Sequence, residues 1–308
     1  TFHAYATTMQ RTRPTGMTTL STHDTKRGED VRARLSVLAE LPEHWERTVG
    51  EWRSAAAGHR RPAGPDPATE YLMWQTLVGA WPLDAERLTA YLHKATREAK
   101  LHTSWTSPNA DYDEAVDAFA RAVLADSALC GRVAAFVDEL DPAARVVTLG
   151  QKLVQLTMPG VPDVYQGTEF TTLTLVDPDN RRPVDFDARR ARLAALDAGE
   201  PPADLDDEKL LVTSRALRLR RDHPDAFSGD YRPLPTSSPH LFGFVRADQV
   251  VTLVTRLPRT WAGDHGEHTV DLPSGTWVDV LTGRQFASGP HAAAKLLDPL
   301  PVALFLRS

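Results

Sequence analysis

The chain has little of the features that would place it in a specialised structural class. It contains 308 residues and one cysteine, Cys130, so no internal disulfide is possible. A single thiol fits a reducing compartment, and we expect the cytoplasm. No apolar run approaches the roughly 20 residues that span a bilayer, and no signal peptide is visible. These absences exclude disulfide-stapled and helical membrane-spanning architectures.

An excess of basic charge is also missing. The chain carries 35 lysines and arginines against 41 aspartates and glutamates, which gives a net charge of −6 and a pI near 6.0. This balance does not predict a basic surface that would bind nucleic acid or an anionic membrane, so neither partner is expected. The composition is that of a globular protein with room for about two domains. The sequence opens at Thr1 in mid-pattern, and we expect a piece of something longer.

A dense polar cluster follows the first predicted strand. Residues 17–20 (Met-Thr-Thr-Leu) read as a strand, and residues 21–27 (Ser-Thr-His-Asp-Thr-Lys-Arg) separate it from a helical pattern. In parallel α/β folds, the loops at the carboxyl ends of strands hold the chemistry. The candidate functional residues of this loop are His23, Asp24, Lys26 and Arg27.

A purely structural role is open for the same cluster. Asp24 or Thr25 could cap the next helix, with His23 bonded to a backbone carbonyl and with Lys26 and Arg27 solvated. A metal site has less support, because the sequence shows no second cluster of His, Asp or Glu at helix or hairpin spacing. We therefore expect no metal and no other cofactor.

The segment after this cluster is predominantly helical. Apolar residues recur at helical spacing, and the proline- and glycine-rich stretch 59–67 interrupts them as an exposed loop. Asp84 is expected to cap one helix, and Pro142, at a favoured first-turn position, to begin the last one. A Pro-Gly turn then leads to a second short strand at 161–165, which ends in polar residues.

The C-terminal part changes to a two-residue period. Residues 207–222 predict an amphipathic, arginine-rich helix, and from Tyr231 onward apolar residues alternate. Proline and glycine turns separate five candidate strands at close spacing, which favours an antiparallel sandwich. The five candidate strands are 241–245, 250–254, 268–272, 276–280 and 302–306.

This layout resembles the C-terminal part of an α-amylase-clan (β/α)8 enzyme. Residues 22–24 (Thr-His-Asp) are similar to the clan's signature at the end of the seventh strand, and residues 158–169 to its eighth strand and loop. More narrowly, residues 21–27, 94–105 and 177–183, together with the long helical insertion, resemble the maltooligosyl trehalose synthase family. The resemblance covers nearly the whole chain.

The resemblance implies an α/β plus β architecture: the last two βα units of a (β/α)8 barrel with a large helical insertion, then a C-terminal antiparallel β-sandwich domain. The expected boundaries are 1–40 for barrel strand 7 and the following helix, 41–141 for the helical insertion, 142–228 for the strand 8 region and closing helix, and 229–308 for the sandwich domain. Two strands cannot close an eight-stranded barrel. The resemblance therefore implies a partner, the missing N-terminal part of the same enzyme.

The resemblance also implies an activity. Enzymes of this family are isomerases of trehalose biosynthesis: they convert the reducing-end α-1,4 linkage of a maltooligosaccharide into an α,α-1,1 linkage by intramolecular transglucosylation. The chemistry needs a carboxylate nucleophile and a general acid, which by resemblance come from strands upstream of this chain. Asp24 is then the third catalytic carboxylate, with His23 donating a hydrogen bond beside it.

Several further substrate contacts are expected from the same resemblance. Lys26 and Arg27 are expected to hold hydroxyls of the glucose that is retained during the reaction. Tyr165, at the end of the second strand, either lines the pocket or has a structural role in its loop. Trp105, in a polar loop, is the tryptophan expected to contact the sugar, since an indole ring can stack on a sugar face.

Other interpretations stay open for the arginines and for the activity. Arg181 and Arg182 either reach sugar hydroxyls or pair with Asp177 and Asp179, and we favour the local pairing. The activity could be that of another glucan hydrolase or transglycosylase of the clan, or the chain could be a non-catalytic glucan-binding module. With two of three catalytic carboxylates absent, we expect the isolated chain to be inactive.

Overall fold

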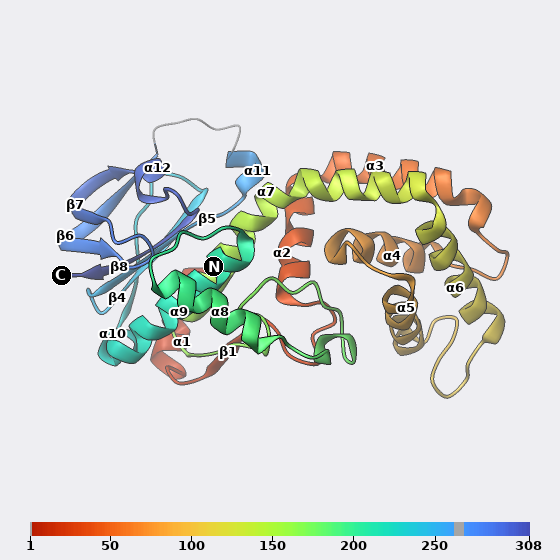
Figure 1. The fold of residues 1–308 in the computed structure, drawn as a ribbon, viewed down its shortest axis with the longest axis horizontal. Coiled ribbons are helices and arrows are strands. Elements are labelled where there is room, and N and C mark those ends of the chain that lie inside the picture. Colours follow the sequence, from red (N-terminus) through yellow and green to blue (C-terminus); the bar gives the residue numbers. More distant parts are fainter. Residues whose placement is uncertain (1, 262–267) are drawn as a thin grey trace. The chain divides into compact units, whose positions relative to one another are not determined.

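The computed structural model describes residues 2–261 and 268–308. The chain divides into two compact units (Figure 1). One, here named the sheet unit, contains residues 1–22, 145–172 and 183–308, and the other, the helical unit, contains residues 23–144 and 173–182. Within residues 2–261 and 268–308, no helix combines the length and the apolar character needed to cross a membrane.

The helical unit is built from α-helices and short 3-10 helices joined by loops. Its elements are α2 (Glu29–Val37), η1 (Leu38–Glu40), α3 (Pro42–Ala55), η2 (Ala56–His59), α4 (Pro67–Ala80), α5 (Ala85–Ala99), α6 (Ala110–Ala125), the first part of α7 (Ser127–Thr157) and η3 (Asp179–Arg181). Asp84 caps α5, as the sequence predicted, by accepting a hydrogen bond from the amide of Arg87 at 2.8 Å. The stretch 60–66 is a loop without helix or strand, also as predicted.

Aromatic side chains fill the core of the helical unit. Trp45 and Trp52 of α3, Trp74 of α4 and Phe136 of α7 are buried, and their ring centroids lie 5.5–5.9 Å apart. Two of these pairs are edge-on, one is tilted and one is stacked, and aromatic rings at this spacing attract one another. The apolar spacing seen in the sequence therefore reports the packing face of these helices.

Asp66 anchors the start of α4. Its carboxylate accepts hydrogen bonds from the amides of Ala68 (2.9 Å) and Thr69 (3.2 Å) and from the hydroxyl of Tyr112 on α6 (2.6 Å). Burial opposes the charged form, but these hydrogen bonds outweigh it and lower the pKa of Asp66 from 3.8 to about 2. Burial and the bond to Asp66 raise the pKa of Tyr112 to about 12. One carboxylate thus joins two helices.

The sheet unit combines two β-sheets with helices. Its elements are α1 (Phe2–Thr12), β1 (Met17–Thr19), the last part of α7, β2 (Val161–Asp163), α8 (Phe186–Asp197), α9 (Leu205–Asp222), α10 (Pro224–Ser228), β3 (Tyr231–Pro233), β4 (Leu241–Arg246), β5 (Val250–Thr255), α11 (Pro258–Trp261), β6 (Thr269–Asp279), β7 (Gln285–Ala292), α12 (Ala293–Leu296) and β8 (Val302–Arg307). The amphipathic helix predicted at 207–222 is α9.

The two short strands predicted on either side of the helical segment form one parallel pair. β1 and β2 pair in parallel, with Met17 opposite Val161. Gly160 precedes β2 at φ +117°, and a Cβ there would lie 2.7 Å from the carbonyl oxygen of Gly16, so only glycine fits. The side-chain amide of Gln155 on α7 donates to carbonyls of both strands, Thr18 at 3.2 Å and Asp163 at 2.8 Å.

The C-terminal strands form a six-stranded antiparallel sheet in the order β3-β4-β5-β8-β6-β7. Side chains of β5 alternate between two cores: Val250 packs with Leu156 of α7, whereas Val251 packs with Trp277 of β6. The period of two in the sequence therefore correctly predicted an antiparallel β-structure. Because hydrogen bonds connect all six strands, a division into two sandwiched sheets is not confirmed.

Two details of the sequence prediction are wrong. Residues 268–272 and 276–280 were expected as separate strands, but β6 is one strand whose register with β7 shifts between Leu272 and Thr276. Such an irregularity lets the intervening Pro-Ser-Gly remain in the sheet. Pro142 does not begin a helix, because α7 runs through it from Ser127 to Thr157 as one long helix (Figure 1). The apolar contacts along α7 outweigh the one hydrogen bond that a proline removes.

The Asp66 link makes a testable prediction about stability. Asp66→Ala should reduce the free energy of unfolding by about 1–2 kcal/mol at pH 7, because a helix cap is lost and the Tyr112 hydroxyl loses its acceptor. A carboxyl with a lowered pKa stabilises the fold above its unfolded value, 3.8, and loses this effect as the pH falls towards about 2. The difference between parent and variant, measured by urea denaturation, should therefore shrink between pH 4 and pH 2. Asp84→Ala, which removes a cap without a tyrosine partner, is the control and should cost less.

Candidate functional site

The polar cluster predicted at residues 21–27 lies in the turn between β1 and α2. The helix α2 begins at Glu29, and its N-cap is Gly28, without any side-chain capping bond. Asp24 and Thr25 therefore do not cap the helix, and the structural interpretation that the sequence left open for them is wrong. Both residues precede the helix by several positions, in a segment with turn and bend geometry.

His23 and Asp24 form an exposed pair at the tip of this turn. The Nε2 atom of His23 lies 3.4 Å from Oδ2 of Asp24, and the two side chains are 52% and 78% exposed. An imidazole and a carboxylate at this spacing can present a donor and an acceptor side by side. The arrangement suits a ligand rich in hydroxyl groups.

The backbone of the turn is held by a distant loop, residues 173–182. The carbonyl oxygen of His23 accepts two hydrogen bonds from this loop, from the backbone amide of Asp177 (3.2 Å) and from the side-chain amide of Asn180 (2.9 Å). The amide of Gly28 donates to the carbonyl oxygen of Thr174 at 2.8 Å, and Arg27 forms an antiparallel bridge with Leu175. The loop thus fixes both ends of the candidate turn.

Lys26 points to α5 and forms an ion pair there. Its ammonium lies 2.8 Å from Oε2 of Glu98, and the two side chains are 58% and 37% exposed. The hydrogen bond to Glu98 raises the pKa of Lys26 above its ordinary value. Lys26 is therefore positioned and charged, rather than simply solvated as the structural interpretation assumed.

Arg27 points to α4. Its guanidinium donates to the side-chain oxygen of Gln75 (3.4 Å) and to the hydroxyl of Thr76 (3.3 Å). It also lines a hollow of about 690 Å³ in the helical unit, together with Trp45 and Tyr71. A direct contact with sugar hydroxyls, as predicted for Arg27, requires a ligand that enters this hollow or a rotation of the guanidinium.

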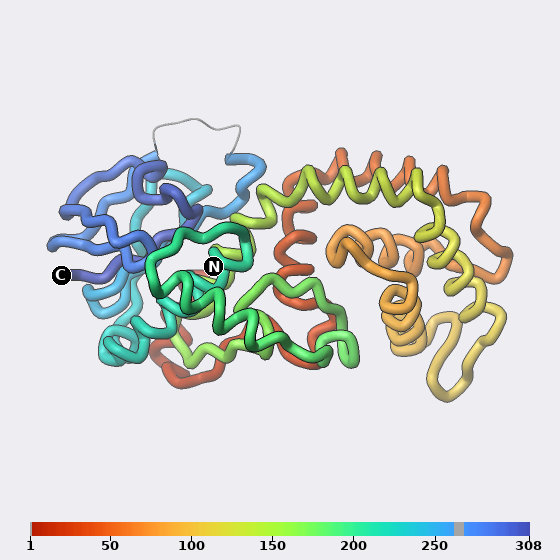
Figure 2. The backbone as a smooth tube through the Cα atoms, viewed as in Figure 1, coloured from red at the N-terminus to blue at the C-terminus, as the bar shows by residue number. Residues whose placement is uncertain are grey.

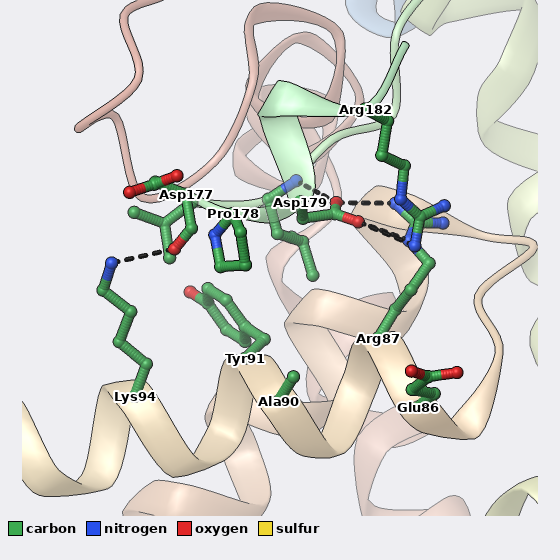
Figure 3. Close-up of a pocket in the computed structure, with 11 residues that line it drawn as sticks. Glu86, Arg87, Ala90, Tyr91, Lys94, Asp177, Pro178, Asp179 and Arg182 are labelled. Atoms are coloured by element: carbon green, nitrogen blue, oxygen red, sulfur yellow. Dashed lines mark hydrogen bonds and ion pairs between the residues drawn. The ribbon is translucent and has the colours of Figure 1, made fainter.

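A second cavity, of about 240 Å³, lies between α5 and the loop 173–182 (Figure 3). Tyr91, Ala90 and Pro178 give it apolar walls, and Lys94 and Arg87 project into the region where the loop passes over α5 (Figure 3). Such a mixture of an aromatic ring with charged groups is suitable for a small polar ligand.

The arginines of the loop are committed to local ion pairs. Arg181 lies 2.9 Å from Asp177, and Arg182 lies 3.1 Å from Asp179. The local pairing favoured from the sequence is therefore confirmed. The sequence did not predict the role of Asn180, whose side chain donates to the carbonyl of His23 although 157 positions separate the two residues.

Residues 100–109 form a long loop between α5 and α6 (Figure 2). Trp105 belongs to this segment of the sequence. Its side chain is 58% exposed, and the guanidinium of Arg97 lies 5.0 Å from the ring centroid. Arg97 is itself fixed by an ion pair with Asp113 at 2.8 Å. The exposed ring is thus held from one side by a cation, and its predicted contact with substrate stays a prediction.

Tyr165 belongs to the sheet unit, in the loop after β2. Its carbonyl oxygen accepts hydrogen bonds from the amide (3.0 Å) and the hydroxyl (2.7 Å) of Thr168, which close a tight turn. Nearby, Glu169 lies 3.4 Å from Arg189 of α8. The half-buried Tyr165 ring has no role assigned by these contacts, and its substrate role stays a prediction.

Metal-binding potential can be examined wherever the chain is described. In residues 2–261 and 268–308, no group of three or more His, Cys, Asp or Glu side chains is arranged to hold an ion.

The ion pair of Lys26 gives a second prediction. Glu98→Gln should lower the pKa of Lys26 towards its ordinary value of 10.5, because the hydrogen-bonded carboxylate is removed. The free energy of unfolding should change by less than about 1 kcal/mol, since the pair is largely exposed to solvent. NMR titration of the lysine side chain measures the first quantity. Glu114→Gln, which breaks the exposed pair with Arg61, is the control and should leave Lys26 unchanged.

Comparison with known proteins gives a consistent result over the whole chain. No family model matches. A Mycobacterium tuberculosis protein assigned as a maltooligosyl trehalose synthase is 43% identical over 318 aligned positions, which cover 99% of this chain and 39% of that protein. The maltooligosyltrehalose synthase of Arthrobacter ramosus is 42% identical with a TM-score of 0.91, covering 100% of this chain and 40% of that one. A further maltooligosyl trehalose synthase structure, 28% identical, has a TM-score of 0.78 and covers 100% of this chain and 41% of its own.

The chain thus spans about 40% of the length of the relatives that it matches. The similarity extends through both units, since nearly every residue of the chain is aligned. The resemblance stated from the sequence is confirmed: over nearly its whole length, this chain is similar to the C-terminal portion of maltooligosyl trehalose synthases.

Proposed function

We propose that this chain supplies part of the active site of a maltooligosyl trehalose synthase. The reaction would turn the reducing-end α-1,4 linkage of a maltooligosaccharide into an α,α-1,1 linkage, as an intramolecular transglucosylation in trehalose biosynthesis. The observation that carries the proposal is the exposed His23–Asp24 pair, held at its backbone by the loop 173–182. A rigid backbone under an exposed carboxylate is what a preorganised electrostatic group requires.

Asp24 would stabilise the sugar ring as it becomes cationic. Cleavage of a glycosidic bond passes through an oxocarbenium-like state, with a nucleophilic carboxylate and a protonated acid on either side of the bond. We propose that these two groups lie outside this chain. The carboxylate of Asp24 would then bind hydroxyls of the ring and oppose its positive charge, with His23 donating to an adjacent oxygen.

The parallel pair β1–β2 supports a larger barrel around it. Parallel sheets are normally covered on both faces and extended by neighbouring strands. In the described residues these strands pair only with each other, and Met17 (75% exposed) and Val161 (46% exposed) present apolar surface. We propose that they are the seventh and eighth strands of a (β/α)8 barrel whose other strands belong to the N-terminal part of the enzyme.

The retained glucose needs its own binding groups, because its anomeric hydroxyl must attack in place of water. Lys26, held at 2.8 Å by Glu98, offers a cationic donor close to Asp24 in sequence. We assign Arg27 to the same glucose. Its hydrogen bonds to Gln75 and Thr76 of α4 are those it makes when no substrate is bound. Trp105 and Tyr165 are proposed as further substrate-binding residues, since aromatic faces stack on sugar rings.

Replacement of Asp24 tests the catalytic assignment. In the full-length synthase that contains this chain, Asp24→Asn should lower kcat by about 10² to 10³-fold and change KM much less, because the charge is needed mainly in the transition state. Steady-state kinetics with maltopentaose measures both constants. Asp187→Asn, at an exposed aspartate of α8 paired with Arg190, is the control. Unchanged turnover in Asp24→Asn would remove the basis of the proposal.

The products distinguish the synthase from other enzymes of the clan. The full-length enzyme should consume reducing ends of maltopentaose without releasing free glucose, whereas a hydrolase creates new reducing ends. Reducing-sugar assays and chromatography of the products measure this difference.

The 308-residue chain alone should be inactive and should bind maltopentaose weakly by calorimetry, since two catalytic carboxylates are proposed to lie elsewhere. Tight binding by the isolated chain would instead identify a non-catalytic glucan-binding module.

A further inference from the structure

The loop that fixes the candidate turn is itself fixed by α5. The guanidinium of Arg87 binds both carboxylate oxygens of Asp179, Nε to Oδ1 at 2.8 Å and Nη2 to Oδ2 at 2.9 Å (Figure 3). The same Nη2 donates to the carbonyl oxygen of Leu173 at 2.7 Å. Lys94, two turns further along α5, donates to the carbonyl oxygen of Asp177 at 2.9 Å (Figure 3).

Asp179 has a second function inside the loop. Its Oδ2 atom also accepts a hydrogen bond from the amide of Leu175 at 2.8 Å, and its side chain is only 12% exposed. Burial alone would raise the pKa of Asp179, but hydrogen bonds from Arg87 and from the Leu175 amide outweigh it and lower the pKa. The carboxylate therefore stays charged, and it joins α5 to the loop and one part of the loop to another.

A continuous set of contacts runs from α5 to the candidate turn. Arg87 and Asp179 determine where the loop lies, and the loop contacts the turn at its two ends, through the carbonyl of His23 and the amide of Gly28. Every contact lies within the helical unit. An exposed turn can adopt many backbone conformations. This set of contacts favours the one in which the turn carries Asp24 at its observed position.

We infer that Arg87 and Asp179 are positioning residues for the His23–Asp24 turn. The inference rests on the proposed function of Asp24 and assigns no substrate contact to Arg87 or Asp179. Because a guanidinium and a carboxylate can form two parallel hydrogen bonds, this pair determines an orientation and not only a distance. The bidentate pair, 13% and 12% exposed, differs in this respect from exposed single-bond pairs such as Arg61–Glu114.

Hydrogen exchange in the 308-residue chain tests the physical part of this inference. Arg87→Gln and Asp179→Asn should accelerate exchange of the Gly28 and Asp177 amides by about tenfold or more, because local opening of the turn becomes easier. Lys94→Met removes one contact without leaving a buried charge unpaired, and it should act in the same direction by a smaller factor. Arg61→Gln is the control and should not affect these two amides.

The distribution of exchange separates positioning from general stability. The inference expects faster exchange at Gly28 and Asp177 while amides in the centres of α3 and α4 keep their parent rates. Equal acceleration throughout the helical unit, or unchanged exchange at both amides in all three variants, overturns it.

Kinetics of the full-length synthase tests the consequence for the reaction. Arg87→Gln and Asp179→Asn should lower kcat by about 10- to 100-fold with a smaller effect on KM, since a displaced catalytic group costs rate more than binding. Arg87→Lys keeps the charge but cannot form the two parallel bonds, so it should restore less than half of the lost rate.

Asp24→Asn in the same assay distinguishes the two possible failures. Loss of turnover in Asp24→Asn with full turnover in the Arg87 and Asp179 variants overturns the positioning role alone. Full turnover in Asp24→Asn overturns the proposed function and this inference with it.

Discussion

The candidate site depends on one carboxylate, that of Asp179, whose side chain is 12% exposed. A charged group with little exposure is costly unless every lone pair has a partner, and Asp179 meets this condition through Arg87, Arg182 and the Leu175 amide. Removal of Arg87 would take away two of the hydrogen bonds to this carboxylate, so the position of the loop depends on α5. The loop in turn contacts the segment 23–28 through the carbonyl of His23 and the amide of Gly28.

Other carboxylates of the helical unit also accept several hydrogen bonds and thereby join separate parts of the chain. Asp66 joins the start of α4 to Tyr112 of α6, and the buried Glu70 accepts hydrogen bonds from Arg60 (2.6 and 3.0 Å) and from the indole of Trp74 (3.2 Å). The sheet unit relies instead on apolar side chains that alternate along strands such as β5 and β8. Polar anchors of this kind fix orientation as well as distance, which helices joined by loops need more than hydrogen-bonded strands do. A site that must hold a defined geometry is therefore well placed on the helical unit.

The sequence predicted what depends on local pattern. Alternation identified β4, β5 and β8, helical spacing identified α9, and the sequence around Asp84 identified a helix start. It failed where distant contacts override a local rule. Pro142 lies inside α7 because the helix is stabilised by packing along its length, and β7 was missed because glycine and proline interrupt its alternation.

The same limit explains what was found and missed at the site. The cluster of His23 and Asp24 is visible in the sequence because its residue types are unusual for a turn. The contact between Asn180 and His23 has no local signal, because the two residues are 157 positions apart and an asparagine in a turn-rich loop is ordinary. The ion pair of Arg87 with Asp179 is hidden for the same reason, since 92 positions separate its members. Only the fold brings the supporting groups to the turn.

The exposure of Asp24 determines how much electrostatic stabilisation its carboxylate can give to a nearby positive charge. At 78% exposure its charge is surrounded by water, where a unit charge 4 Å away is attracted by only about 1 kcal/mol. In a partly enclosed site with an effective dielectric constant near 20, the same pair gains about 4 kcal/mol. The difference, about 3 kcal/mol, corresponds to a rate factor on the order of 10². The catalytic role that we propose for Asp24 therefore requires that substrate and the further part of the enzyme cover it, while the loop 173–182 holds the backbone of the turn.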